Sequence, residues 1–217
     1  MSRTLCAIFV AAAALLVVTG AQAKAPPNGV DICGADGACL HLTWQQAETS
    51  WALWSSADAP SVAPGPVAPF LLVRWQWPGQ SEQTAYYIPS TGEVRQHDST
   101  GLTSWLKLGN ATELRTMAAG LTPYPVPHVM SVTVAGHPVR DPQSYLRIFG
   151  AGENWFAAIL PRFLRITFTT DTPSPWTDGA DDYFISRKGR LMWIDGTIVR
   201  IPLQLAQRIR ARRSLAP

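Results

Sequence analysis

The chain has 217 residues, of which 47% are hydrophobic, and a formal net charge of +3 from eighteen basic and fifteen acidic side chains. This length is enough for one large domain or two small ones of about 100 residues each. So mild a positive excess argues against a nucleic-acid-binding protein, which would carry a clustered basic surface.

Residues 1–23 have the three parts of a secretory signal peptide. Arg3 gives a positive start, residues 5–18 form an unbroken apolar run, and Ala-Gln-Ala at 21–23 is a cleavage site. The run is shorter than the about 20 apolar residues that span a bilayer. An uncleaved N-terminal anchor is the alternative. We expect export, cleavage before Lys24 and no membrane span in the mature chain.

Cys33 and Cys39 are the only cysteines after the signal segment. They flank Gly-Ala-Asp-Gly-Ala, whose Asp36-Gly37 step predicts the turn of a hairpin. A hairpin brings its flanks within disulfide distance, and export provides an oxidising setting. The spacing is not the Cys-x-x-Cys of a redox centre, and a zinc site needs four ligands, of which only His41 is near. We therefore expect a disulfide, with a metal site or free thiols as alternatives.

Residues 24–120 form the first of two predicted units. After the cysteine hairpin, its expected elements are a helix capped by Thr43, a proline-rich loop at 58–69, a strand at 70–77, a hairpin at 84–97, and a helix within 103–120 that starts near Asn110 and ends at Gly120. Residues 121–130 follow as a connector, extended by three prolines at alternate positions.

Residues 131–217 repeat this order as a second unit. The expected elements are a hairpin at 131–139, a short helix at 141–150 with Asp141 as N-cap, a strand at 161–170, a turn-rich loop at 171–182, a hairpin at 182–195 and a terminal helix at 201–213. Residues 86–94 match 183–191, and 101–115 match 196–210. The fold class is therefore α+β, with two hairpin-rich units that each end in a helix and a possible duplication.

Nine tryptophans are the unusual feature of the composition. Trp75 and Trp77 share one face of a predicted strand, and Trp176 sits in a polar loop. Such rings, if exposed, offer flat surfaces that stack on a sugar or a peptide, so these three are candidate binding residues. The alternative is that large aromatic side chains fill the core of a small secreted domain.

Four aspartates lie close together in the loop at 171–182: Asp171, Asp178, Asp181 and Asp182. Their oxygens suit Ca²⁺, although the spacing is not that of an EF-hand loop. They are weak metal candidates, and turn formation around Asp178-Gly179 is the alternative. Arginines 208, 210, 212 and 213 near the terminal helix either stabilise the helix dipole or contact an anionic polymer or lipid headgroup.

No established catalytic motif is present. The chain lacks the Gly-x-Ser-x-Gly elbow, a glycine-rich phosphate loop and His-Glu-x-x-His. His97, Asp98 and Ser99 are adjacent in sequence, and neighbours cannot easily converge as base, orienting group and nucleophile. We assign no catalytic residue and no cofactor, and we lean toward a protein that is not an enzyme.

Several stretches resemble uncharacterised exported proteins of high-GC actinobacteria. They include VDICGADGAC, AYYIPSTGEVR, GLTPYPVP, VTVAGHPVRDPQSYLRIF and the long segment from PSPWTDGADD to IPLQLAQRI. The likeness covers most of residues 30–210. It implies export, a bacterial origin and a single disulfide, and it implies no mechanism.

We therefore expect a secreted, non-catalytic module, monomeric or weakly associating, that binds a cell-envelope component or a protein partner. The alternative is an extracytoplasmic hydrolase that uses the loop carboxylates at 171–182 around Trp176. A structural envelope protein without a ligand is a third possibility.

Overall fold

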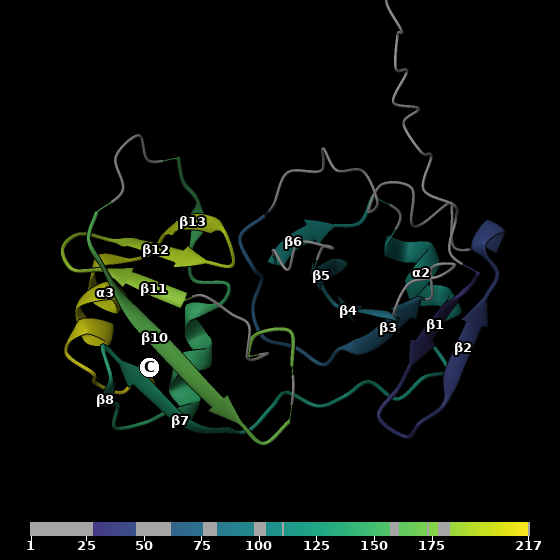
Figure 1. The fold of residues 1–217 in the computed structure, drawn as a ribbon, viewed down its shortest axis with the longest axis horizontal. Helices are drawn as coiled ribbons and strands as arrows, with labels where there is room; N and C mark the ends of the chain where they lie inside the picture. The colour runs from purple at the N-terminus through teal and green to yellow at the C-terminus, as the bar shows by residue number, and fades with distance from the viewer. Residues whose placement is uncertain are drawn as a thin grey trace, which may run out of the picture.

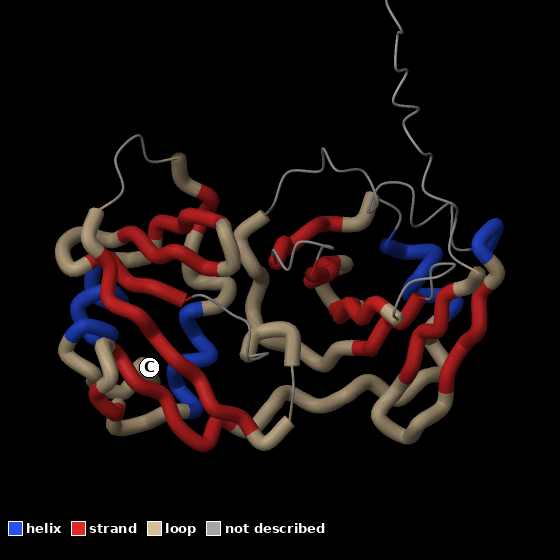
Figure 2. The backbone as a smooth tube through the Cα atoms, in the orientation of Figure 1, coloured by secondary structure: helices blue, strands red, loops and turns tan. Residues whose placement is uncertain are grey.

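The computed structural model describes residues 28–46, 62–75, 82–97, 103–109, 111–156, 161–172, 174–177 and 183–216. The predicted signal peptide lies outside these parts of the chain. Within them, two antiparallel sheets and a few short helices form an α+β fold, as expected (Figures 1 and 2). Among the described residues, no helix has the length and apolar character needed to cross a bilayer.

The first sheet has six strands in the order β2-β1-β3-β4-β5-β6. Their bounds are β1 Val30–Cys33, β2 Cys39–Leu42, β3 Leu71–Trp75, β4 Gln83–Ile88, β5 Glu93–His97 and β6 Thr103–Lys107. The helix α2, Ala111–Met117, follows β6 and packs Leu114 into the hydrophobic cluster on one face of the sheet.

The second sheet has seven strands in the order β8-β7-β10-β11-β12-β13-β9. Their bounds are β7 Val129–Val134, β8 His137–Pro138, β9 Glu153–Asn154, β10 Phe163–Thr170, β11 Tyr183–Ser186, β12 Leu191–Ile194 and β13 Thr197–Arg200. The 3₁₀ helix η1, Gln143–Ile148, follows β8, and the helix α3, Leu203–Arg210, follows β13.

The two sheets share one topology. Each starts with a hairpin whose second strand lies at the edge, continues with a four-stranded antiparallel meander and is followed by a helix; β9 is an addition at the far edge of the second sheet. The two sequence matches fall on corresponding elements, β4 with β11, and β6 and α2 with β13 and α3. This common order supports a duplication, which stays a hypothesis.

The elements differ from the expectations in two respects. The helix expected over 141–150 is the 3₁₀ helix η1, preceded by Pro142 without a side-chain cap. The strands β6 and β13 extend two expected hairpins into meanders, because residues 103–107 and 197–200 pair with β5 and β12. The β12–β13 connection is a two-residue turn, in which Asp195 and Gly196 have φ angles of 46° and 78°, as a tight hairpin requires.

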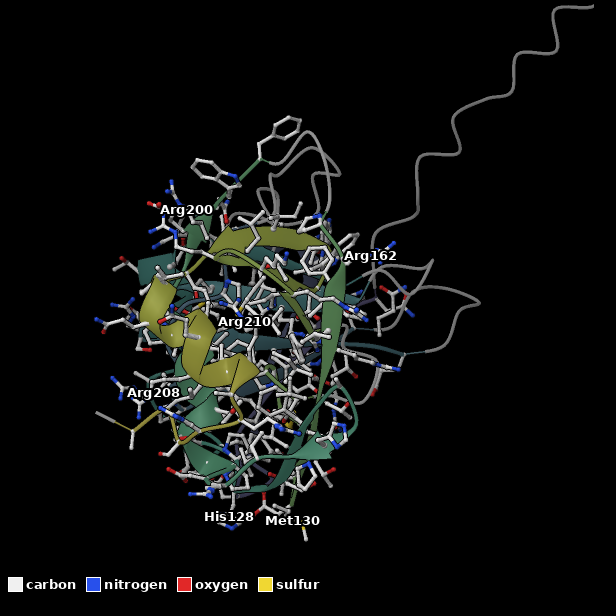
Figure 3. All side chains as sticks on the ribbon, turned by 90° about the vertical axis from the view of Figure 1, so that its left-hand side faces the viewer. His128, Met130, Arg162, Arg200, Arg208 and Arg210 are labelled. Carbon is white, nitrogen blue, oxygen red and sulfur yellow. A yellow bond between two sulfur atoms is a disulfide. The ribbon has the colours of Figure 1, made fainter. Side chains whose placement is uncertain are left out.

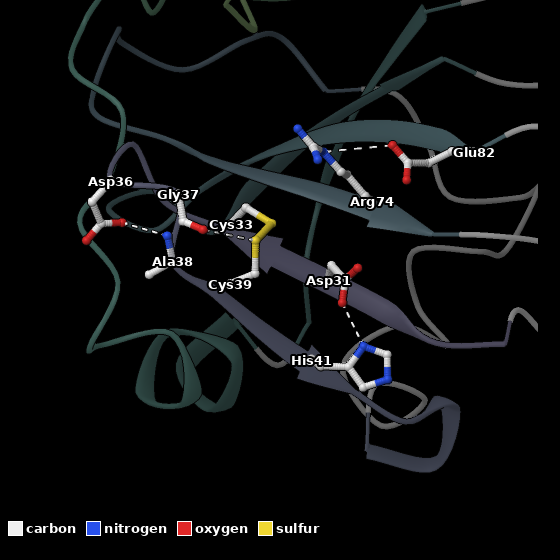
Figure 4. Close-up of a disulfide and its surroundings, with 9 residues drawn as sticks. All are labelled: Asp31, Cys33, Asp36, Gly37, Ala38, Cys39, His41, Arg74 and Glu82. Carbon is white, nitrogen blue, oxygen red and sulfur yellow. Dashed lines mark hydrogen bonds and ion pairs between the residues drawn. A yellow bond between two sulfur atoms is a disulfide. The ribbon is translucent and has the colours of Figure 1, made fainter.

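Cys33 and Cys39 form the expected disulfide (Figure 4). They face each other across the β1–β2 ladder with their Cα atoms 4.1 Å apart. Asp36 Oδ1 accepts a hydrogen bond from the Ala38 N–H and fixes the turn. A disulfide of this kind is compatible with a location outside the cytoplasm.

The two halves of the molecule share a hydrophobic core. Figure 1 shows the sheets side by side along the long axis of the molecule. One cluster joins Phe70, Tyr86 and Trp105 of the first half to Phe149 and other residues of the second. Strand β4 is buried on both faces. Tyr86 and Ile88 enter the cluster shared by the two halves, while Ala85 and Tyr87 enter the second cluster, which α2 covers. The halves therefore do not form two separate cores.

Candidate binding site

Trp176 is fully buried. Its ring lies 6.2 Å from that of Phe70 and 5.9 Å from that of Trp105, both in the first half, and 6.5 Å from that of Phe149 in the second. The candidate binding role of Trp176 required an exposed ring, and the burial contradicts it; the alternative, core filling, is the one observed, because the indole packs where the two halves meet.

Trp75 is also buried, with 5% of its surface exposed. Its Nε1 donates a hydrogen bond to Gln83 Oε1 at 2.9 Å, and its ring belongs to the cluster beneath α2. The face of β3 that carries Trp75 therefore packs inward, and the expected stacking platform is wrong for this residue. Trp77 lies outside the described residues.

Of the four loop aspartates, the structure describes Asp171, while Asp178, Asp181 and Asp182 lie outside the described residues. Asp171 Oδ1 accepts hydrogen bonds from the His128 N–H at 3.0 Å and the Thr172 hydroxyl at 3.2 Å. The carboxylate thus ties the end of β10 to the segment before β7. No group of three His, Cys, Asp or Glu side chains able to hold a metal occurs within the described parts of the chain.

The arginines of the C-terminal segment have a partly structural role. Arg210, on α3, donates from Nη1 to the carbonyl oxygens of Ser186 and Gly189, and so holds the β11–β12 turn against the helix. Figure 3 shows Arg208 and Arg210 on this helix. Neither the helix-dipole interpretation nor contact with an anionic partner is tested by these contacts.

Beyond α3, the chain is fastened to η1. The Ser214 hydroxyl donates to Asp141 Oδ2, the Leu215 N–H to the Ser144 hydroxyl, and Arg147 to the Leu215 carbonyl oxygen. The hydrogen bond from Ser214 lowers the pKa of the Asp141 carboxyl. Asp141 therefore binds the C-terminal segment, and its hydrogen bonds with Ser144 of η1 also lower the pKa of this carboxyl.

A cleft that sequence reasoning did not find opens beside β9 and β13. Its volume is about 430 Å³. The lining residues are Gly150, Ala151, Gly152, Glu153, Arg190, Arg200, Ile201 and Pro202. Antiparallel pairing of Leu191 with Arg200 brings Arg190 and Arg200 to the same end of the β12–β13 hairpin. Two arginines and a single glutamate, Glu153, thus line one cleft.

Two exposed aromatic residues, Trp155 and Phe156, directly follow β9, and the first of them contacts an arginine that lines the cleft. The Arg200 guanidinium carbon is 4.5 Å from the centroid of the Trp155 ring, within the range of a cation–π interaction. Trp155 is 43% exposed and Phe156 is 89% exposed. The Trp155 N–H donates to the Ile198 carbonyl oxygen at 2.8 Å, which extends the β13–β9 pairing and holds this segment at the sheet edge.

Close backbone packing fixes the wall of the cleft. Gly150 has a φ of 74°, and a Cβ there would lie 2.6 Å from the backbone nitrogen of Pro66. Its N–H donates to the Pro64 carbonyl oxygen at 2.9 Å. On the other side, a Cβ at Gly152 would lie 3.0 Å from Val199 Cβ. The cleft wall is therefore held between the first half of the chain and β13.

The charge of the chain is divided between the halves. Residues 24–130 contain five basic and eight acidic side chains, and residues 131–217 contain twelve basic and seven acidic ones. The small net charge of the whole chain conceals this division, which a charge count for each predicted unit would have found. Since the cleft has two arginines in the basic half, its chemistry suits an anion rather than a metal cation.

The aromatic pair was missed for a different reason. Trp155 and Phe156 follow a two-residue strand, which is too short for a periodic pattern to reveal.

Comparisons with protein-family models, with curated proteins and with solved structures find no match to this chain.

Proposed function

We propose that this chain is an exported, non-catalytic binding module, and that it holds an anionic component of the cell envelope at the cleft beside β9 and β13. The observation that carries the proposal is the presence of both Arg190 and Arg200 in the lining of one cleft, with Arg200 stacked on an exposed tryptophan.

Electrostatics favours an anionic ligand. Arg190 and Arg200 line the cleft with a single acidic residue, Glu153, so the charge around the cleft is net positive and attracts an anion. Arginine also binds carboxylate and phosphate oxygens in a bidentate manner. Trp155 keeps the side chain of Arg200 stacked at the cleft. Arg200 therefore loses less conformational entropy when a ligand binds than a freely moving side chain would.

The proposed export rests on the disulfide and on the signal-like residues 1–23, and the resemblance to exported actinobacterial proteins agrees with it. The described residues do not test the alternative of a hydrolase, because Asp178, Asp181 and Asp182 lie outside them; Asp171, the one loop aspartate among them, accepts hydrogen bonds from the His128 N–H and the Thr172 hydroxyl.

Binding of inorganic polyphosphate, measured by calorimetry, tests the proposal. We expect the R190A/R200A variant to lose at least about tenfold in affinity, which is about 1.4 kcal/mol. R162A is the matched control, because Arg162 is exposed and lies on another side of the second sheet (Figure 3). Equal affinities of wild type and R190A/R200A would refute the proposal.

A further inference from the structure

We propose that the anionic component bound by this module is the surface of a membrane rich in acidic phospholipid, into which Trp155 and Phe156 insert while Arg190 and Arg200 contact the phosphates. This inference rests on the proposed anion-binding function and identifies its partner.

The first argument is the exposure of the aromatic pair. Phe156 is 89% exposed and Trp155 is 43% exposed, and the two are consecutive at the end of an edge strand. Leaving such rings in water is unfavourable, and aromatic rings are enriched at the depth of lipid headgroups. The Trp155 N–H donates a hydrogen bond to the Ile198 carbonyl oxygen, which holds Trp155 at the edge of the second sheet, next to Phe156 in the chain.

The second argument is the position of the charges. Arg190 and Arg200 line the cleft, and the Arg200 guanidinium carbon is 4.5 Å from the centroid of the Trp155 ring. Trp155 and Arg200 are thus close enough to reach adjacent layers of one surface. A membrane provides an apolar layer next to a phosphate layer, whereas a soluble polyanion provides only the charge.

The third argument is the basic character of the whole second half, which contains twelve basic against seven acidic residues. Its exposed arginines would add long-range attraction to an anionic surface, and such attraction weakens as salt is added. The aromatic contribution does not depend on salt in this way. If both the arginines and the aromatic rings contribute to membrane binding, high salt should weaken that binding only in part.

Sedimentation with lipid vesicles tests this inference. The wild-type chain should bind vesicles of phosphatidylglycerol and phosphatidylcholine in equal parts, and bind vesicles of phosphatidylcholine alone far more weakly. W155A/F156A should reduce partitioning at least about tenfold. R190A/R200A should reduce it about fivefold for each arginine lost. M130A is the apolar control, because Met130 is 62% exposed and lies at the opposite end of the second sheet from Arg200 (Figure 3).

The polyphosphate measurement separates the two proposals. F156A, which leaves Trp155 in place to order Arg200, should keep its affinity for polyphosphate, because that ligand has no apolar layer. If polyphosphate binds at the arginines and the wild-type chain ignores anionic vesicles, or if W155A/F156A binds vesicles as wild type does, the membrane inference is overturned and the anion-binding function stands. If neither ligand binds, both proposals fail.

Discussion

Arg95 and Asp195 form an ion pair that joins the two sheets in the interior of the protein. Arg95 Nε lies 3.3 Å from Asp195 Oδ2, and neither side chain is exposed to solvent. The same oxygen accepts hydrogen bonds from Trp105 Nε1 at 2.9 Å and from the Tyr183 hydroxyl at 3.5 Å. Since Arg95 and Trp105 belong to the first sheet, the turn that carries Asp195 is bound to both halves of the chain.

Removing the charge of Asp195 should destabilise the protein strongly. D195N keeps an acceptor for Trp105, and asparagine tolerates the φ of 46° at this position. The substitution leaves the guanidinium of Arg95 buried without its carboxylate. We expect the free energy of unfolding, measured in urea, to fall by about 3–5 kcal/mol.

An exposed ion pair supplies the control for D195N. Arg74 Nε lies 3.8 Å from Glu82 Oε1, and the two side chains are 44% and 42% exposed. E82Q should therefore cost less than about 1 kcal/mol. The double variant R95M/D195N should be more stable than D195N alone, because it removes the buried charge. Equal effects of D195N and E82Q, or no recovery in R95M/D195N, would contradict this account.

The disulfide should stabilise the first half measurably. Cys33 and Cys39 are six residues apart in sequence, and closing so short a loop contributes about 2–2.5 kcal/mol in the chain-entropy model. C33A/C39A should lose that amount without leaving a free thiol in the hairpin. Urea unfolding of both proteins measures the difference, and wild type under a reducing agent should approach the variant. If the variant is as stable as oxidised wild type, the disulfide makes no contribution to the free energy of unfolding.

Local patterns predicted most of the elements. The turn signals at Asp36-Gly37 and Gly136 mark real hairpins, and Thr43 does cap a helical turn: its hydroxyl accepts a hydrogen bond from the Gln46 N–H, while the Gln46 side chain accepts one from the Thr43 N–H. These features depend on residues a few positions apart, which is the range that periodicity and capping describe.

Long-range contacts were beyond such patterns. The alternation of side chains along a strand shows which residues share a face of the sheet, but it does not show which other element packs against that face. Tyr86 and Tyr87 point to opposite sides of β4, and both are buried, one by the second half and one by the cluster beneath α2. Trp176 is buried for the same reason. The Arg95–Asp195 pair joins residues 100 positions apart, so no local signal could predict it.

Trp176 and Trp155 should respond very differently to truncation. Trp176 is fully buried among rings of both halves, so W176A should lower the free energy of unfolding by about 3–5 kcal/mol. Trp155 is 43% exposed, and W155A should cost much less, with a thermal midpoint close to that of wild type. Thermal and urea unfolding of the two variants give the comparison. Similar losses for both would mean that Trp176 does not support the shared core.

Tyr145 should make the protein lose stability at alkaline pH. Its side chain is fully buried, and its hydroxyl has no hydrogen-bond partner among the described residues. Burial raises the pKa of Tyr145 to about 12, although the charges of Arg208 and Arg212 oppose the shift. An unfolded tyrosine has a pKa of about 10. The folded state therefore keeps the proton over a range in which the unfolded state releases it.

The sign of the effect follows from this difference. Below about pH 10 both states are protonated, and the contribution of Tyr145 is fully present; from there to about pH 12 unfolding releases a proton, so stability falls as pH rises. Y145F should abolish this part of the loss, and at neutral pH it should be as stable as wild type or more stable, because it removes a buried hydroxyl without a partner. Tyr87, whose pKa is also raised by burial, should leave a residual slope in Y145F. Urea unfolding across the alkaline range measures both slopes, and identical slopes for wild type and Y145F would show that Tyr145 titrates normally in the folded protein.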